Sequence, residues 1–193
     1  MMVLVGALIV AVVVIYGWYA VIVMRKNKML EALGGIDVHL KQRHDLIPNI
    51  LVIARRFMEH EKTLMDDITR LRTQAAEKVG ARAAGDVQQK FDVEGALGRD
   101  LGRLFVSVEN YPQLRSNETM VQAQHTYSEV EANLAAARRF YNAAVNSLRN
   151  AVQIFPGNML GRLGGVKEIP PFFEADQAER APVAADSILK PGI

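Results

Sequence analysis

The stretch VLVGALIVAVVVIYGWYAVIVM, residues 3–24, decides the architecture because its 22 residues carry no charge and include eight valines. A helix of this length rises roughly 33 Å at about 1.5 Å per residue, enough to cross a hydrocarbon layer of about 30 Å. Valine's low helix propensity does not oppose this, because hydrocarbon offers the backbone no other hydrogen-bond partners. The run therefore predicts a transmembrane anchor over residues 1–24.

The residues that flank this run predict its fate and its orientation. Only Met1 and Met2 precede it, without the basic leader and small-residue cleavage pattern of a signal peptide, so we expect an uncleaved, single-pass anchor. Basic residues cluster after the run, and the positive-inside rule then places the N-terminus outside and the rest of the chain in the cytoplasm. They are Arg25, Lys26, Lys28, Lys41 and Arg43.

Composition excludes several classes of function. The chain has 23 basic and 21 acidic residues, a net charge of +2, so it lacks the strong positive field that attracts nucleic acid. It contains no cysteine, which excludes disulfides, thiolate metal sites and thiol nucleophiles. We expect no nucleic-acid partner.

Beyond the anchor, apolar residues repeat at helical spacing and indicate an all-α helical bundle over residues 25–158. No segment alternates with the two-residue period of a strand. The clearest stripe, over residues 117–155, is apolar or tyrosine throughout: Ala123, Tyr127, Val130, Leu134, Ala137, Tyr141, Val145, Leu148, Val152 and Phe155. A second stripe runs from Ile47 to Leu71, and a third from Leu97 to Val108.

The sequence also indicates where the helices end. Gly80 and Gly85 bracket a polar loop, and YPQLRSN, residues 111–117, ends one helix and offers Ser116 or Asn117 as the cap of the next. FPGN, residues 155–158, is a further stop. After it, the apolar segment 159–174, rich in glycine and proline, is expected to pack on the bundle or the membrane, and residues 175–193 have the composition of a flexible tail.

The polar stretch IDVHLKQRHDLIPN, residues 36–49, is predicted to be a helix corner. Ile36, Leu40, Arg43 and Ile47 share one helix face, and Asp37 with Lys41 forms a favourable i, i+4 pair. Pro48 disfavours the helical conformation at the residue before it, and Asp45 is placed to cap a new helix beginning near Leu46. A reversal and a kink at Pro48 are both compatible with the sequence.

No arrangement of side chains in the sequence predicts catalysis, a cofactor or a metal. His39 and His44 are five residues apart and diverge around a helix, while His60 and His125 lie far from them in the sequence. The neighbours Asp66 and Asp67 point about 100° apart, which does not suit paired carboxylate chemistry. A polar stripe on the last long helix either bonds across to residues 36–45 or faces water: Arg138, Asn142, Asn146 and Asn150.

Four motifs in this order resemble the LemA family: IDVHLKQRHDLIPN at residues 36–49, ENYPQLRSN at 109–117, ARRFYNAAV at 137–145 and FPGN at 155–158. The resemblance implies a cytoplasmic antiparallel four-helix bundle tethered to the bacterial inner membrane, without an established enzymatic activity. It also implies association of relatives with membrane-protein quality control beside a zinc protease, and of one branch with magnetosome membranes.

Three functions follow as hypotheses. The first is a membrane-anchored, non-enzymatic scaffold that contacts lipid and self-associates as a homo-oligomer through coiled-coil-like packing. The second is an adaptor or sensor for a membrane protease, in which the bundle holds a client. The third is an enzyme or metal-binding protein that uses His39, His44 or Glu59, and the absence of ligand spacing places it last.

Overall fold

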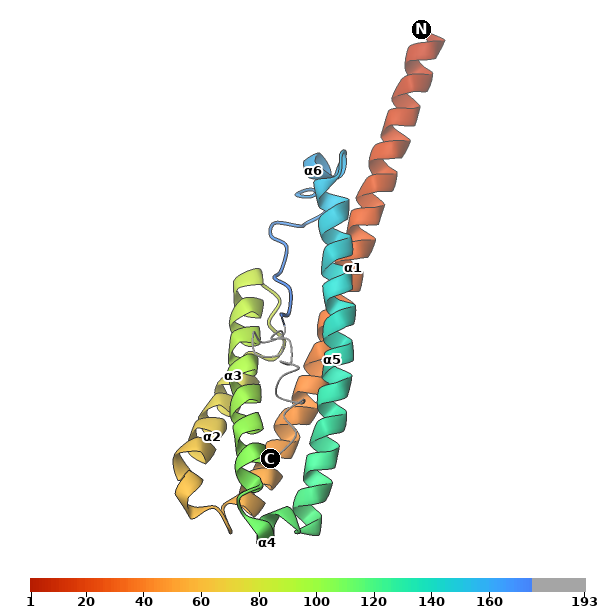
Figure 1. Ribbon diagram of the computed structural model, residues 1–193. Coiled ribbons are helices and arrows are strands. Elements are labelled where there is room, and N and C mark those ends of the chain that lie inside the picture. The colour runs from red at the N-terminus through yellow and green to blue at the C-terminus, as the bar shows by residue number, and fades with distance from the viewer. Residues whose placement is uncertain (175–193) are drawn as a thin grey trace, which may run out of the picture.

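A computed structural model describes residues 1–174 of the 193-residue chain, and it confirms the predicted all-α class. Within those residues every regular element is a helix. The tail predicted for residues 175–193 lies outside the described part. Figure 1 shows the elements: α1 (Met2–Ala54), a short 3-10 turn (Glu59–Glu61), α2 (Lys62–Glu77), α3 (Ala84–Val108), α4 (Pro112–Arg115), α5 (Glu118–Gln153) and α6 (Gly157–Leu160).

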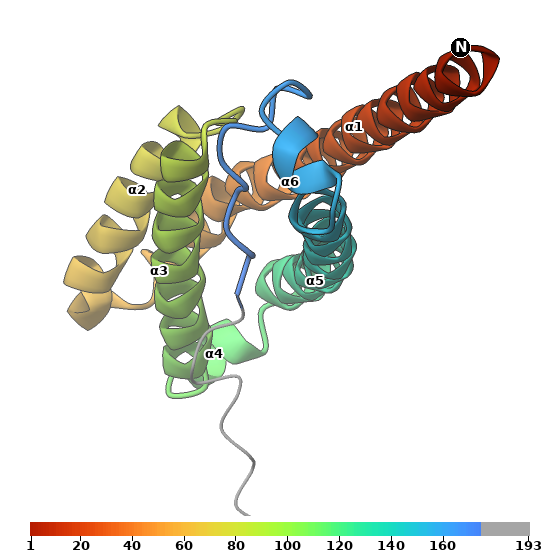
Figure 2. The same cartoon turned by 90° about the horizontal axis from the view of Figure 1, so that it is seen from above.

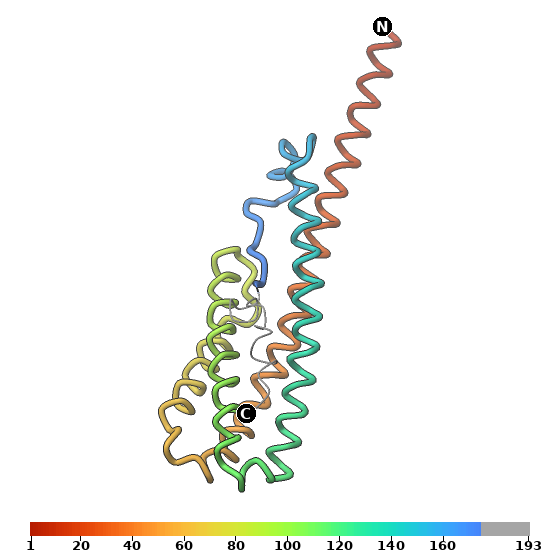
Figure 3. The backbone as a smooth tube through the Cα atoms, viewed as in Figure 1, coloured from red at the N-terminus to blue at the C-terminus, as the bar shows by residue number. Residues whose placement is uncertain are grey.

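Helix α1 is one uninterrupted helix of 53 residues, and its N-terminal part projects beyond the rest of the molecule (Figures 1 and 3). Among the described residues it is the one helix long and apolar enough to cross a membrane by length and composition. Only 6% of its most apolar 18-residue window is buried, so this part is not a core helix of a soluble protein. Leu4 and Leu8, for example, are 75% and 65% exposed.

Helices α5, α6 and α2 pack against α1. Helix α5 runs antiparallel to α1 and packs along it, while α2 and α3 form a second antiparallel pair (Figures 1 and 2). Helix α6 returns to α1 at the end of α5. The lone tryptophan, Trp18, lies at that junction and donates from Nε1 to the Ala151 carbonyl at 3.0 Å.

Two apolar cores lie along the helices at different distances from the N-terminus. The core nearer the exposed anchor joins α1 and α5 with the start of α3 and the C-terminal segment, through residues such as Ile22, Leu33, Leu134, Tyr141 and Phe173. The farther core joins all four long helices, through residues such as Ile47, Met58, Ile68, Leu104 and Met120. Residues 36–49 pass from one core to the other.

A chain reversal at Pro48 with a new helix after it is wrong, because α1 continues through the proline to Ala54. Proline lacks the N–H that would bond the carbonyl of His44 one turn earlier. In the structure the Arg72 side chain of α2 donates from Nε to that carbonyl at 2.8 Å. A helix from elsewhere in the chain therefore satisfies the group that the proline leaves free, and no new helix begins near Leu46.

The chain turns instead at residues 55–61, where the sequence has neither glycine nor proline. Backbone bonds from Phe57 and Met58 to the Ala54 carbonyl, at 3.0 and 2.9 Å, tighten the end of α1 into a turn. Met58 is fully buried in the farther core and holds the turn against it. Burial of this side chain, rather than a turn-forming residue, sets the reversal.

Helix α5 matches the longest predicted stripe and begins where expected. Asn117 caps it, with the side-chain oxygen accepting from the Met120 amide at 3.1 Å. The prediction that Phe155 belongs to this stripe is wrong, because the helix ends at Gln153 and the Phe155 side chain is 73% exposed.

The segment after α6 returns along α5 in extended form. Asn142 holds it through both amide atoms: Nδ2 donates to the Phe173 carbonyl at 2.9 Å, and Oδ1 accepts from the Phe173 amide at 2.8 Å. Tyr141 adds a bond from its hydroxyl to the Pro171 carbonyl at 2.9 Å. The buried Phe173 ring stacks on Phe91 of α3, so the segment fills the space between α3 and α5.

Candidate functional site

A layer of buried charge lies where the two apolar cores meet. Four charged or titratable side chains are buried among residues 1–174: Arg43 and His44 on α1, and Lys90 and Glu94 on α3. Arg43, Lys90 and Glu94 have no exposed surface, and His44 is 4% exposed. Burying charge is unfavourable unless partners replace water, so the geometry of these partners defines the site.

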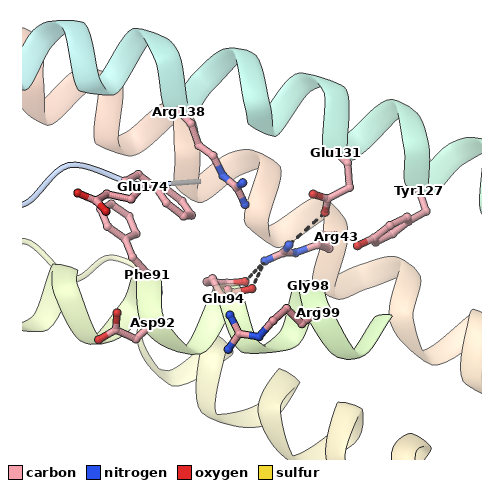
Figure 4. A pocket seen from close by; sticks show the side chains of 12 residues that line it. Arg43, Phe91, Asp92, Glu94, Gly98, Arg99, Tyr127, Glu131, Arg138 and Glu174 are labelled. Atoms are coloured by element: carbon pink, nitrogen blue, oxygen red, sulfur yellow. Dashed lines mark hydrogen bonds and ion pairs between the residues drawn. The ribbon is translucent and has the colours of Figure 1, made fainter. Parts of the chain in front are cut away.

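Arg43 joins three helices through one guanidinium group (Figure 4). Its Nη2 donates to the carboxylate of Glu94 and, at 3.2 Å, to the backbone carbonyl of the same residue. Its Nη1 donates to Oε1 of Glu131 on α5 at 3.1 Å. The planar, multiply donating guanidinium suits this role better than an ammonium group would.

His44 completes the surroundings of the Glu94 carboxylate. Its Nε2 lies 2.9 Å from Oε1 of Glu94, and the bond requires the proton on Nε2 because an ionised carboxylate only accepts. The backbone carbonyl of His44 accepts from Arg72, so the residue after Arg43 links α1 to both α2 and α3. The adjacent pair thus ties all four long helices together.

The electrostatics favour the ionised forms of both partners. Burial would raise the pKa of Glu94, but the hydrogen bond from His44 and the positive charge of Arg43 outweigh it and hold this pKa below its ordinary value. Burial would lower the pKa of Arg43, but the carboxylates of Glu94 and Glu131 outweigh it and raise this pKa. Burial raises the pKa of the nearby Tyr127 hydroxyl, and the charge of Glu131 raises it further.

A second, partly buried ion pair lies closer to the anchor, one helical turn earlier on α3. Lys90 donates from Nζ to Oδ1 of Asp37 at 2.8 Å, and Arg82 donates to Oδ2 of the same carboxylate at 2.8 Å. The predicted pair of Asp37 with Lys41 is therefore wrong; Lys41 instead bonds Asp45 at 2.8 Å on the exposed face. Asp37 serves contacts between helices because it faces α3.

A cavity of about 560 Å³ opens beside this layer, between α1, α3 and α5 (Figure 4). Arg43, Glu94 and Glu131 form one wall, and the stacked rings of Phe91 and Phe173 form another. The Arg138 guanidinium lies over the Phe173 ring, 4.2 Å from its centroid. The predicted polar stripe of α5 thus bonds the C-terminal segment through Asn142, whereas Asn146 and Asn150 are exposed.

The arrangement suits structural fixation rather than bond chemistry. A carboxylate that accepts from Arg43 and His44 has no proton to give, and its lowered pKa makes it a weak base. The histidines do not converge: His39 bonds Gln42 on its own helix, and His60 and His125 are exposed. Within residues 1–174, no three acidic or histidine side chains group to hold a metal.

Glu94, Lys90 and Glu131 were not singled out in the sequence. A signal was present on α3, where Lys90 and Glu94 stand at the spacing of the buried residues Val87, Leu97 and Leu101. Charged residues inside an apolar stripe indicate buried ion pairs. Their partner could not be identified, because Arg43 lies 51 positions from Glu94.

The fold and the site define a class: an all-helical protein with an exposed, apolar N-terminal helix and a core fixed by buried ion pairs. The model of the LemA family matches residues 32–186, so the chain belongs to the LemA family. The match begins within α1, after the apolar run.

Curated relatives of the chain are named as magnetosome proteins. Magnetosome proteins MamQ 1 and MamQ 2 of Paramagnetospirillum magneticum are each 21% identical to the chain over 210 residues, which is 95% of this chain and 77% of theirs. Magnetosome protein MamQ of Magnetospirillum gryphiswaldense is 27% identical over 97 residues, which is 50% of this chain and 35% of the relative.

Proposed function

We propose that the protein is a membrane-anchored, non-enzymatic scaffold of the bacterial inner membrane, with its N-terminus outside and an antiparallel four-helix bundle in the cytoplasm. The observation that carries the proposal is the continuity of α1, whose exposed apolar part passes without a break into the helix that holds Arg43. The basic residues after the apolar run support the orientation. Membership of the LemA family and the magnetosome relatives support a role at a membrane.

Self-association is part of the same proposal. Three large apolar side chains on α3 and α5 are at least half exposed and offer surface to a second copy: Val106, Val121 and Phe140. We expect full-length protein extracted in mild detergent to form a defined oligomer by mass photometry. A strictly monomeric species without a partner contradicts self-association.

The anchor is tested by charge insertion. Val10→Arg and Val13→Arg together place two charges in the middle of the apolar run, each costing about 3 kcal/mol of insertion free energy at a helix centre. We expect the double variant to leave the membrane fraction, and Val52→Arg, on an exposed position of the same helix outside the run, to stay in it. Equal membrane retention of the two variants contradicts a transmembrane anchor.

The cavity favours a second candidate function, that of adaptor or sensor for a membrane protease. Its wall of stacked Phe91 and Phe173 rings, with arginines beside it, offers both apolar and charged contacts to a client segment. The test compares two variants by crosslinking in membranes: one has residues 1–24 replaced by an unrelated transmembrane helix, and the other carries Phe91→Ala. An adaptor loses its crosslinked client with Phe91→Ala but keeps it with the exchanged anchor.

A further inference from the structure

An exposed apolar corner lies beside the anchor at the end of α5. The residues that turn from α5 into α6 leave four large apolar side chains between 57% and 73% exposed, although the same segment has small residues packed inward. The four are Ile154, Phe155, Met159 and Leu163, and we name them the α5–α6 corner. Exposed apolar clusters of this kind mark surfaces that meet an apolar partner.

Contacts with α1 fix the level of this corner along the anchor. Trp18 bonds the Ala151 carbonyl at 3.0 Å, and Gly164 packs so closely on Ile22 that an added Cβ would lie 2.7 Å from its Cγ2. At about 1.5 Å per residue, Trp18 and Ile22 lie about 9 and 3 Å inside the end of the apolar run at Met24. Figure 1 shows α6 beside α1 at this level, short of its free end.

Glycine makes the close approach possible. A Cβ at Gly157 would lie 2.6 Å from Nε1 of Trp18 and on top of the Ala151 carbonyl, so no other residue fits there without moving α6 away. The glycine of the FPGN motif therefore holds the corner against the anchor.

Part of the backbone of the corner is satisfied without water. Several amides bond within the segment: Gly157 to the Ile154 carbonyl at 2.7 Å, Gly161 to Gly157 at 2.8 Å, and Val166 to Gly161 at 3.0 Å. Backbone groups that are satisfied internally can enter the boundary of a bilayer at low cost. Nearby cations provide the polar edge, since Arg162 is exposed and Lys26 bonds the Gly165 carbonyl at 3.1 Å.

We propose that the α5–α6 corner inserts into the phospholipid interface of the leaflet that the anchor leaves on its C-terminal side. This inference rests on the proposed transmembrane anchor. With the anchor embedded to Met24, the levels of Trp18 and Ile22 place the corner several ångströms inside the hydrocarbon boundary, within the roughly 5–10 Å at which interfacial apolar faces lie. Arg162 extends its charge back to the headgroups along its methylene chain. The protein thus meets the bilayer at two places.

The test is the depth of nitroxide labels in the full-length protein in nanodiscs of phosphatidylcholine and phosphatidylglycerol. The chain has no cysteine, so single labels can be placed by Met159→Cys at the corner, Leu8→Cys in the anchor and Val121→Cys at the far end of α5. We expect collisions with a water-soluble nickel chelate to be severalfold rarer at positions 159 and 8 than at 121. Leu163→Cys, at 72% exposure, provides a second label at the corner.

The outcomes separate the inference from the function on which it rests. Labels at 159 and 163 that collide with nickel as often as the label at 121, while the label at 8 is protected, overturn the inserted corner and leave the anchor intact. A label at 8 that is accessible to nickel overturns the anchor and the corner together. Protection of positions 8, 159 and 163 supports both.

Discussion

The pair of Arg43 and Glu94 should be strongly coupled, and a double-mutant cycle measures that coupling. Both side chains are fully buried, and each is the other's principal partner of opposite charge. Removing one member of a buried pair costs about 3–5 kcal/mol, because the other charge stays buried without compensation. We therefore expect a loss of this size in the free energy of unfolding for Arg43→Met and for Glu94→Leu.

The double variant removes both charges and leaves smaller defects. His44 loses its acceptor while 4% exposed, an unsatisfied group worth about 1–3 kcal/mol. Glu131 is freed from Arg43, but its side chain is 29% exposed and can hydrate. The expected loss is thus about 1–3 kcal/mol for the double variant, against about 6–10 kcal/mol for the sum of the singles.

The assay is urea unfolding of full-length protein in detergent, followed by circular dichroism at 222 nm. The exposed pair Lys41 and Asp45 is the matched control on the same helix, with side chains 70% and 60% exposed. A cycle of Lys41→Met and Asp45→Leu should give a coupling of no more than about 1 kcal/mol. Additive losses at Arg43 and Glu94, within about 0.5 kcal/mol, would refute the reasoning.

Three further predictions concern single side chains. The folded pKa of Glu94 is lowered from 4.5, so its ionised form stabilises the fold above about pH 4.5, and this contribution is lost as pH falls through the folded pKa. The difference in unfolding free energy between wild type and Glu94→Gln should therefore shrink on acidification, as urea unfolding at several pH values would show. Asn142→Ala should accelerate hydrogen exchange of the Phe173 amide, and the exposed Asn146→Ala should not, as mass spectrometry of exchanged peptides would show. Tyr141→Phe should lose about 1 kcal/mol of thermal stability by calorimetry, because the bond to the Pro171 carbonyl disappears; no change in the melting temperature contradicts a role for it.

Elements with regular patterns could be predicted from the sequence. The stripe over residues 117–155 predicted α5 because 3.6-residue periodicity depends only on neighbours along the chain, and its Asn117 cap is local too. The face of Ile36, Leu40, Arg43 and Ile47 was also correct, since all four are buried. The sequence pattern therefore predicts those elements whose conformation depends on residues nearby in the chain.

Features that depend on distant residues could not be predicted. Pro48 predicts a break, but Arg72, 28 residues from His44, satisfies the His44 carbonyl that the proline leaves free. The turn at residues 55–61 follows from the burial of Met58 in a core formed by other helices. The ion pairs of Asp37 and Arg43 join residues 45 to 88 positions apart, so their partners become visible only once the helices are placed.

Because α1 is unbroken, a tilt of its membrane end moves the far end of the same helix. From Arg25 to Ala54 the helix extends about 45 Å at about 1.5 Å per residue, so a 10° tilt of the anchor would swing its far end through about 8 Å. Trp18 and α6 clamp the anchor to the bundle, so this rotation is not absorbed by a hinge near the lipid. Tilting is one way in which an embedded helix adjusts to a change in bilayer thickness. A thinner or thicker membrane would thus reorient the whole body that α2, α3 and α5 form with α1.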